Sequence, residues 1–272
     1  PDALDVSFNF RGRPDIDYIA QLTKKTTDAV AEELEASGLA FQDPSTGFWL
    51  DRAEYLSGRV KDKLTKAKEL TETEPRYLKH VEELEKVQPR YLAIGEFATR
   101  LGASWIPPDI IERFIRETFD KPVRVTVVPE TATWSVSPVD RLAQPSEADT
   151  TVWGVHGVSG TTMVAHSLNL QRVDVKDPVP DGSGGVRYEL NKGKTMEARS
   201  KQGRIEREFQ RWVRNVPEVA AELEPIYNQE LNISTLPQYR APSWTFYPGA
   251  STDITLRPDQ KVAVSRGLKN SV

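Results

Sequence analysis

Cysteine is absent from this chain of 272 residues. Its absence excludes a disulfide framework, a thiol nucleophile and a cysteine-liganded zinc site, so a reducing compartment is the expected setting. Long apolar runs are also lacking, since none approaches the roughly 20 residues that a membrane-spanning helix needs. The sequence therefore predicts no membrane partner.

An excess of basic charge is lacking as well, because 36 Lys and Arg residues stand against 40 Asp and Glu residues, a net charge of −4. This balance excludes a protein that coats DNA with an overall positive surface, although phosphate binding needs only a local basic patch. The charged fraction of 28% and the six tryptophans are typical of a globular protein. The length is enough for one large domain or two ordinary ones.

Histidine is scarce, and the three histidines His80, His156 and His166 lack the spacing of a two-histidine metal site on a helix. The carboxylates lie mostly on charged helix faces, and no pair stands out as an acid and base couple. No glycine pattern of a serine nucleophile elbow is present. We therefore expect neither catalytic residues nor metal ligands in this chain.

Two short motifs resemble known sites but lack a required residue. The segment "YELNKGKTMEA" contains Gly-Lys-Thr, but Tyr188 stands where a phosphate loop needs its first glycine, so Lys194 is interpreted as the start of a helix. The segment "WIPPDII" resembles the catalytic loop of amino-methyltransferases, but Ile106 and Asp109 fill neither of that loop's flanking roles. It is interpreted as a helix start.

Residues 15–52 form the clearest module. The segments "DIDYIAQL" and "TDAVAEELEAS", separated by "TKKT", each place apolar residues on one helical face, with Thr27 as a candidate N-cap and Gly38 as the stop. The segment "LAFQDPSTGFWLD" then has two short apolar runs around a turn, which indicates a hairpin. Helix, turn, helix and hairpin is the order of a winged helix-turn-helix, whose second helix can enter a major groove.

Two roles stay open for this winged-helix-like module. Its second helix carries Asp28, Glu32, Glu33 and Glu35, and this acidity argues against base reading because carboxylates repel phosphate. A winged helix can instead serve as a spacer between protein domains. If the module does contact DNA, Lys24 and Lys25 in the break between its helices are the candidate contacts.

The whole chain predicts an α+β fold that is mostly helical, with short β-hairpins. After the module, helices are expected in "YLSGRVKDKLTKAKEL", in "PRYLKHVEELEKV" and from Pro108 onward, followed by a hairpin in "VRVTVVPETATWSVSP". The second half predicts the following elements: a strand and a short helix in 152–170, strands at 173–176 and 186–190 around "PDGSGG", helices at 194–215 and 218–231, and an aromatic loop at 239–247.

The expected domain division has four parts, with the clearest boundary around residues 138–150. They are a winged-helix-like module at 1–52, a helical segment ending in a β-hairpin at 53–137, an α/β segment with a long basic helix at 150–253, and the truncated start of a helicase ATPase core at 254–272. The chain starts with proline rather than methionine, and a helix-like pattern continues to Val272. We expect a fragment of a longer protein.

The long helix near 199–214 has the most informative charge pattern. Basic residues recur three or four positions apart and so share a face, whereas apolar residues such as Phe209 fall on the opposite side. Such a stripe could follow a nucleic-acid backbone, or it could be a solvated face or pair with the acidic helix at 218–230. The basic residues are Lys201, Arg204, Arg207, Arg211 and Arg214, diluted by Glu197, Glu206 and Glu208; the other apolar residues are Ile205, Trp212 and Val213.

Six segments occur in an order that resembles one known family: "EYLSGRVKDKL", "VEELEKVQPRYL", "RLGASWIPPDIIERF", "KQGRIEREFQRW", "IYNQELN" and "ITLRPDQKVAV". This order resembles the region upstream of the helicase in large methyltransferase–helicase proteins of phages, plasmids and integrative elements. These are adenine-specific DNA methylases fused to a Swi/Snf-like superfamily 2 helicase, and they include DarB-like antirestriction proteins. The resemblance covers nearly the whole chain, from about Ala3 onward.

The resemblance implies roles for the C-terminal segment and for the parent protein. Gln260 would help to position the adenine of ATP, with Arg257 and Pro258 forming the turn before the helix, although many relatives carry histidine where this chain has Asp259. Binding sites for ATP with Mg²⁺ and for S-adenosylmethionine would belong to the parent protein and lie outside these residues. The implied partners are duplex DNA and the adjoining helicase and methyltransferase domains, in the cytoplasm of a bacterial host or packaged in a virion.

The leading hypothesis is thus a non-catalytic region that guides DNA and docks on the ATPase core of a methyltransferase–helicase from a phage or another mobile element. The alternative is a structural protein–protein interaction module without DNA contact. A complete enzyme with an unrecognised site is a third interpretation, and it would require a deep pocket lined by convergent titratable groups.

Overall fold

The computed structural model describes residues 2–140, 142, 144, 146–180, 185–241, 251 and 253–269. The chain forms two compact units, the first built from residues 1–90 and 231–272 and the second from residues 91–230. The four-part domain division stays a prediction, and its boundary at 138–150 falls inside the second unit. Most of the expected "PDGSGG" turn and of the aromatic loop at 239–247 lies outside the described residues.

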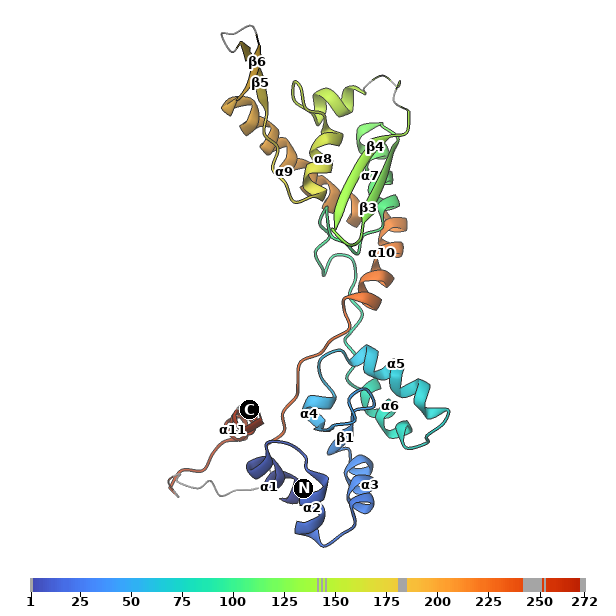
Figure 1. Cartoon of the computed structure of the whole chain (residues 1–272), viewed down its shortest axis with the longest axis vertical. Coiled ribbons are helices and arrows are strands. Elements are labelled where there is room, and N and C mark those ends of the chain that lie inside the picture. The colour runs from blue at the N-terminus through green and yellow to red at the C-terminus, as the bar shows by residue number, and fades with distance from the viewer. Residues whose placement is uncertain are drawn as a thin grey trace. The chain divides into compact units, whose positions relative to one another are not determined.

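The first unit begins with three helices and a two-stranded wing (Figure 1). The helices are α1 (Asp2–Arg11), α2 (Ile16–Thr23) and α3 (Thr27–Ser37), and the antiparallel strands are β1 (Ala40–Gln42) and β2 (Trp49–Asp51). Their shared core consists of Leu4, Ile19, Ala20, Val30, Leu34 and Ala40. This arrangement confirms the predicted winged-helix module and the mostly helical α+β class. Helix α1 was not predicted, because its apolar residues do not follow helical spacing.

The helix ends in this module follow local hydrogen-bond chemistry. The predicted N-cap Thr27 is wrong by one residue, since the side chain of Thr26 accepts the hydrogen bond from Ala29 N at 3.3 Å. Gly38 ends α3 as predicted, with φ at 65°. A Cβ on Gly38 would lie 3.0 Å from Arg52 Nη1, so both the backbone angle and the space favour glycine here.

Three further helices pack beside the wing and form a second core. They are α4 (Arg52–Tyr55), α5 (Val60–Thr71) and α6 (Tyr77–Glu85). The single helix expected over 55–70 is wrong, because Gly58 has φ at 68° and breaks it between α4 and α5. The core comprises Phe41, Tyr55, Leu56, Val60, Ala67 and Leu84.

The chain returns to the first unit after residue 230. Gly58 and Thr235 form an isolated antiparallel bridge, and the Asn232 side-chain amide donates to Arg90 O at 2.7 Å. The two chain segments that leave and re-enter this unit therefore run side by side. Helix α11 (Pro258–Lys269) follows and lies near α1.

The second unit is a helical layer with two hairpins. It contains α7 (Pro108–Phe119), the hairpin β3 (Val123–Val128) with β4 (Thr133–Pro138), the π-helical turn η1 (Ala148–Val152), α8 (Gly160–Leu168), the hairpin β5 (Lys176–Pro180) with β6 (Val186–Leu190), α9 (Lys192–Asn215) and α10 (Pro217–Glu230). Its core joins α7, α8, α9 and α10, and includes Ile111, Phe114, Met163, Phe209 and Leu223.

Two predicted strands of this unit differ from the structure. The strand expected at 173–176 begins only at Lys176, because Val173 N and Val175 N donate to side chains of α9, at 3.2 and 3.0 Å, instead of to a neighbouring strand. The strand expected before α8 is reduced to an isolated bridge between Val155 and Val158. The predicted hairpin after α7 and the two long helices at the end are confirmed.

Candidate nucleic-acid interface

One side of α9 is fixed to the core of the second unit. Ile205, Phe209 and Val213 are fully buried, and the Phe209 ring packs edge-on against Phe114 with centroids 5.1 Å apart. The helix begins at Lys192, after the N-cap Asn191, whose side chain accepts from Lys194 N at 2.9 Å. Because an α-helix turns about 100° per residue, the residues opposite these apolar positions must face solvent.

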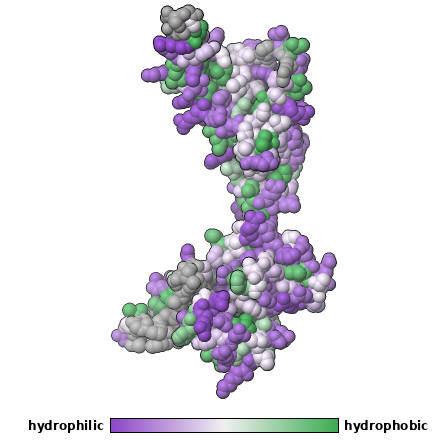
Figure 2. Space-filling view, viewed as in Figure 1, coloured by the Kyte–Doolittle hydropathy of each residue, from purple (hydrophilic) through white to green (hydrophobic). Residues whose placement is uncertain are grey.

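The opposite face of α9 carries four exposed arginines, Arg204, Arg207, Arg211 and Arg214. The surface over this part of the second unit is largely hydrophilic in Figure 2. Lys201 does not join them, because its side chain is only 18% exposed. Its Nζ donates to the carbonyl oxygens of Thr151 and Gly154, and it thereby holds η1 and the chain just after it against the helix.

The four arginines are only partly neutralised by neighbours. Arg211 pairs with Glu208, and the guanidinium of Arg204 lies 5.4 Å from the centre of the Trp153 ring. Within the part of the chain that the structure describes, Arg207 and Arg214 have no ion pair. The face therefore keeps most of its positive charge.

The acidic helix α10 does not pair with these arginines among the described residues. Its carboxylates Glu218 and Glu222 lie 4.0 and 3.5 Å from the guanidinium of Arg113 on α7. Glu206 of α9 accepts from Ser167 Oγ at 2.9 Å. The sequence left open that α10 neutralises the basic stripe. In these contacts its carboxylates Glu218 and Glu222 face α7 instead.

Hydrogen bonds at Glu117 hold the C-terminal half of α9 in place. Trp212 Nε1 donates to Glu117 Oε2 at 2.8 Å, and Arg113 Nε donates to Glu117 Oε1 at 3.1 Å. Burial alone would raise the pKa of Glu117, but these two hydrogen bonds lower it below the ordinary value. The carboxylate stays ionised and fixes α9 on α7, which presents the arginine face on a rigid element.

The predicted contacts of the winged-helix module lie in the turn between α2 and α3. Lys24 ends α2 in a left-handed conformation with φ at 57°, and Lys25 forms an ion pair with Glu33. The exposed side of α3 carries Asp28 and Glu32 in addition. The charge that this helix would bring into a DNA groove is therefore negative, and Lys25 is already paired.

The predicted nucleotide contacts Arg257 and Gln260 lie at the start of α11. Gln260 Oε1 accepts from Arg257 N at 2.9 Å, which is half of a capping box. Arg257 Nε lies 3.9 Å from a carboxylate oxygen of Asp259, and both side chains are 72% exposed. In this arrangement Gln260 stabilises the helix start.

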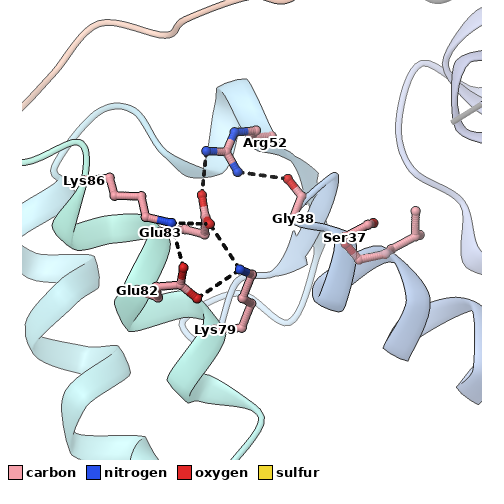
Figure 3. Close-up of polar contacts among 8 residues, drawn as sticks. Ser37, Gly38, Arg52, Lys79, Glu82, Glu83 and Lys86 are labelled. Carbon is pink, nitrogen blue, oxygen red and sulfur yellow. Dashed lines mark hydrogen bonds and ion pairs between the residues drawn. The ribbon is translucent and has the colours of Figure 1, made fainter.

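Sequence reasoning missed a polar network around Glu83, which Figure 3 shows. The Glu83 carboxylate on α6 contacts Arg52 at 2.5 Å, Lys86 at 2.9 Å and Lys79 at 3.2 Å, and Arg52 also donates to Gly38 O at 3.1 Å. Burial opposes ionisation of Glu83, but hydrogen bonds from Lys86, Arg52 and Lys79 lower its pKa to about 2. The network ties the end of α3 and the start of α4 to α6.

A buried triad strengthens the same junction. His80 Nδ1 lies 2.8 Å from Tyr55 Oη, and His80 Nε2 lies 3.2 Å from Glu35 Oε1, with His80 fully buried. Burial raises the pKa of the Tyr55 hydroxyl above its ordinary value. Because the imidazole has no access to solvent, this triad joins α3, α4 and α6 and is not placed to act on a substrate.

Clusters of metal-ligating side chains and membrane-spanning helices are both absent from the described part of the chain. Its residues contain no group of three or more His, Asp or Glu side chains arranged to hold a metal ion. None of the helices described above is long and apolar enough to cross a membrane.

Comparison with known families gives two partial matches. Residues 1–50 match the model of a winged helix domain from a probable helicase, and residues 100–233 match a domain of unknown function (DUF8437). No curated protein and no solved structure matches the chain. The N-terminal module is thus similar to a helicase-associated winged helix, and the second unit, which contains α9, is similar to a family without an assigned role.

Proposed function

We propose that this chain is the non-catalytic part of a DNA helicase that holds duplex DNA and docks on the adjoining ATPase core. The observation that carries the proposal is the row of four exposed arginines on α9, held on a rigid helix and left largely unneutralised. Such a row binds phosphates without reading sequence. The match of residues 1–50 to a winged helix domain of a probable helicase supports the proposal that the chain is part of a helicase.

The parent protein that we propose is an adenine-specific DNA methyltransferase joined to a superfamily 2 helicase, of the kind found in phages and plasmids and related to DarB-like antirestriction proteins. Support comes from the six ordered sequence segments and from the helicase-type winged helix. ATP with Mg²⁺ and S-adenosylmethionine would then act outside these residues, in the cytoplasm of a bacterial host or after delivery with a virion. Gln260 and Arg257 remain the proposed nucleotide contacts, with Gln260 helping to position the adenine of ATP.

Titration of a fluorescent 30-base-pair duplex at several salt concentrations tests the DNA contact. Reversing three charges, R204E/R207E/R211E, should weaken binding at least about tenfold and reduce the salt slope by about one for each phosphate that the variant no longer binds. The control R116E/R124E/K176E makes the same charge change elsewhere on the second unit, at exposed positions. Equal weakening by both variants, or no salt-sensitive binding at micromolar protein, contradicts the proposal.

The second candidate function is protein docking by the winged-helix module. It is favoured by the acidic exposed side of α3 and by Phe48, an aromatic side chain of the wing that is 62% exposed. A winged helix used this way contacts a neighbouring domain through the surface that would otherwise face DNA. Tight binding to the isolated ATPase core of the parent protein, abolished in Phe48→Ser and accompanied by no DNA binding, would favour this function over the first.

A further inference from the structure

Leu170 occupies a backbone position that does not suit leucine. Helix α8 ends in a Schellman motif, in which Leu170 N donates to Ser167 O at 3.0 Å and Gln171 N donates to His166 O at 2.8 Å. The residue at this turn has φ at 56°, in the left-handed region that glycine adopts without strain. Leucine adopts it only at an energetic cost.

The Leu170 side chain does not recover that cost by packing. It is 85% exposed, so the fold buries almost none of its apolar surface. Strained backbone positions that local packing does not explain are concentrated at functional sites. Both observations point to a contact that Leu170 makes with another molecule.

The surroundings of Leu170 indicate the chemistry of that molecule. Leu170 lines a hollow of about 670 Å³ beside α9, together with Arg100, Arg172 and Arg199. Arg100 and Arg172 are exposed and, within the described residues, without an ion pair. Arg199 pairs with Asp174 at 2.5 Å, outside the hollow's lining. Three guanidinium groups thus share the hollow with one lining carboxylate, Glu206, which favours a polyanion.

The hollow is continuous with the arginine face of α9. Gly203 lines it, and a Cβ built on Gly203 would lie 3.6 Å from Arg207 Nη1. The guanidinium of Arg207 therefore lies at the rim. A nucleic-acid strand that contacts the arginine face can therefore extend past Arg207 into the hollow.

The loop after Leu170 is held firmly against α9. Gln202 Nε2 donates to Gln171 O at 2.8 Å, and Gln202 Oε1 accepts from Val173 N at 3.2 Å. Arg199 Nε donates to Val173 O at 3.2 Å. With the Schellman motif on its other side, Leu170 is presented in one fixed position.

We propose that Leu170 is an apolar wedge that contacts the bases of duplex DNA while Arg100, Arg172 and Arg199 bind the adjacent phosphates. This inference rests on the proposed DNA contact and adds a second, structurally different binding element to it. Leucine is among the side chains that proteins insert between base steps, and arginines beside such a wedge hold the distorted backbone. The recognised chemistry is a phosphodiester anion next to an apolar base face.

The test compares wild-type protein with Leu170→Gly on a duplex that carries 2-aminopurine, whose fluorescence rises when the base is unstacked. Glycine suits the turn, so the melting temperature of L170G should equal or exceed that of wild type, while duplex affinity falls about fivefold and the fluorescence rise disappears. Leu170→Asn, which also tolerates the left-handed turn, should behave in the same way. Leu236→Gly, a change at an 84% exposed leucine of the first unit, is the matched control.

The outcomes distinguish a failure of the wedge from a failure of the proposed function. If wild type does not bind duplex DNA, the proposed function and the wedge both fail. If R204E/R207E/R211E loses binding but L170G and L170N bind and unstack DNA like wild type, the wedge fails and the DNA contact stands. If R100E/R172E leaves the salt slope unchanged, the assignment of phosphates to the hollow is wrong.

Discussion

Glu83 shows how much one side chain can contribute to the first unit. Its side chain is 7% exposed, and its carboxylate is shared by Arg52 of α4, Lys79 of α6 and Lys86, the C-cap of α6. Removing one partner of such a buried group leaves the others without compensation, which is more damaging than losing a surface ion pair. The junction of α3 and α4 with α6 therefore depends on the ionised state of this residue.

The predicted change is a pH-dependent loss of stability in Glu83→Gln. The pKa of Glu83 is about 2 in the folded protein, below its ordinary value of 4.5. The ionised carboxylate therefore stabilises the folded state fully at a pH above the ordinary pKa, and this contribution is lost as the pH falls toward 2. The free-energy difference between wild type and E83Q should be about 3 kcal/mol at pH 7 and shrink between pH 5 and pH 2. Urea unfolding at five pH values measures it.

A matched control is Glu69→Gln, which removes a 59% exposed carboxylate that pairs with Lys66. Its effect should stay below about 1 kcal/mol at every pH. A constant difference between wild type and E83Q across the pH range would show that the network does not act through the charge of Glu83.

At the scale of the element, α9 combines a buried face with a charged one. Mutations in the buried face should change stability, and mutations in the charged face should change DNA binding. Phe209→Ala removes a fully buried ring between α7 and α9 and should destabilise the second unit by about 3–5 kcal/mol. R204E/R207E/R211E should change the melting temperature little, because these side chains are exposed. Thermal melts of both variants, measured with DNA titrations, check the separation; a large stability loss in the triple variant would contradict it.

The same helix shows what the sequence could and could not predict. Its span and its buried side followed from periodicity, because Ile205, Phe209 and Val213 recur at helical spacing. The position of Lys201 could not be predicted, since its hydrogen bonds reach the distant carbonyls of Thr151 and Gly154. The hollow beside Leu170 was missed for the same reason, because it brings together residues far apart in the chain.

Local signals placed the winged helix, whereas its attachments required tertiary structure. Gly38 marks the end of α3 and the turn residues of the wing mark the hairpin, so both elements were predicted closely. Nothing in the spacing of Glu35, Tyr55 and His80 indicates that they meet, because they come from three helices. Helix α1 was missed because it is defined by packing more than by pattern.

At the scale of the whole molecule, the second unit is a continuous stretch of chain with its own core. Residues 91–230 expressed alone should therefore fold, melt in a single transition and retain duplex binding. Circular dichroism and the duplex titration provide the measurement. If residues 91–230 fail to fold, the core of this unit does not stand alone. If they fold and do not bind duplex DNA, the placement of the DNA contact in this unit alone is wrong.

The contact between Arg90 and Asn232 has a consequence for removal of the second unit. A 2.7 Å hydrogen bond holds the outgoing and returning segments together. Removal of residues 91–230 would therefore leave a gap that a short turn can close. Joining residue 90 to residue 231 through a few glycines should leave the winged-helix module folded, which circular dichroism would measure.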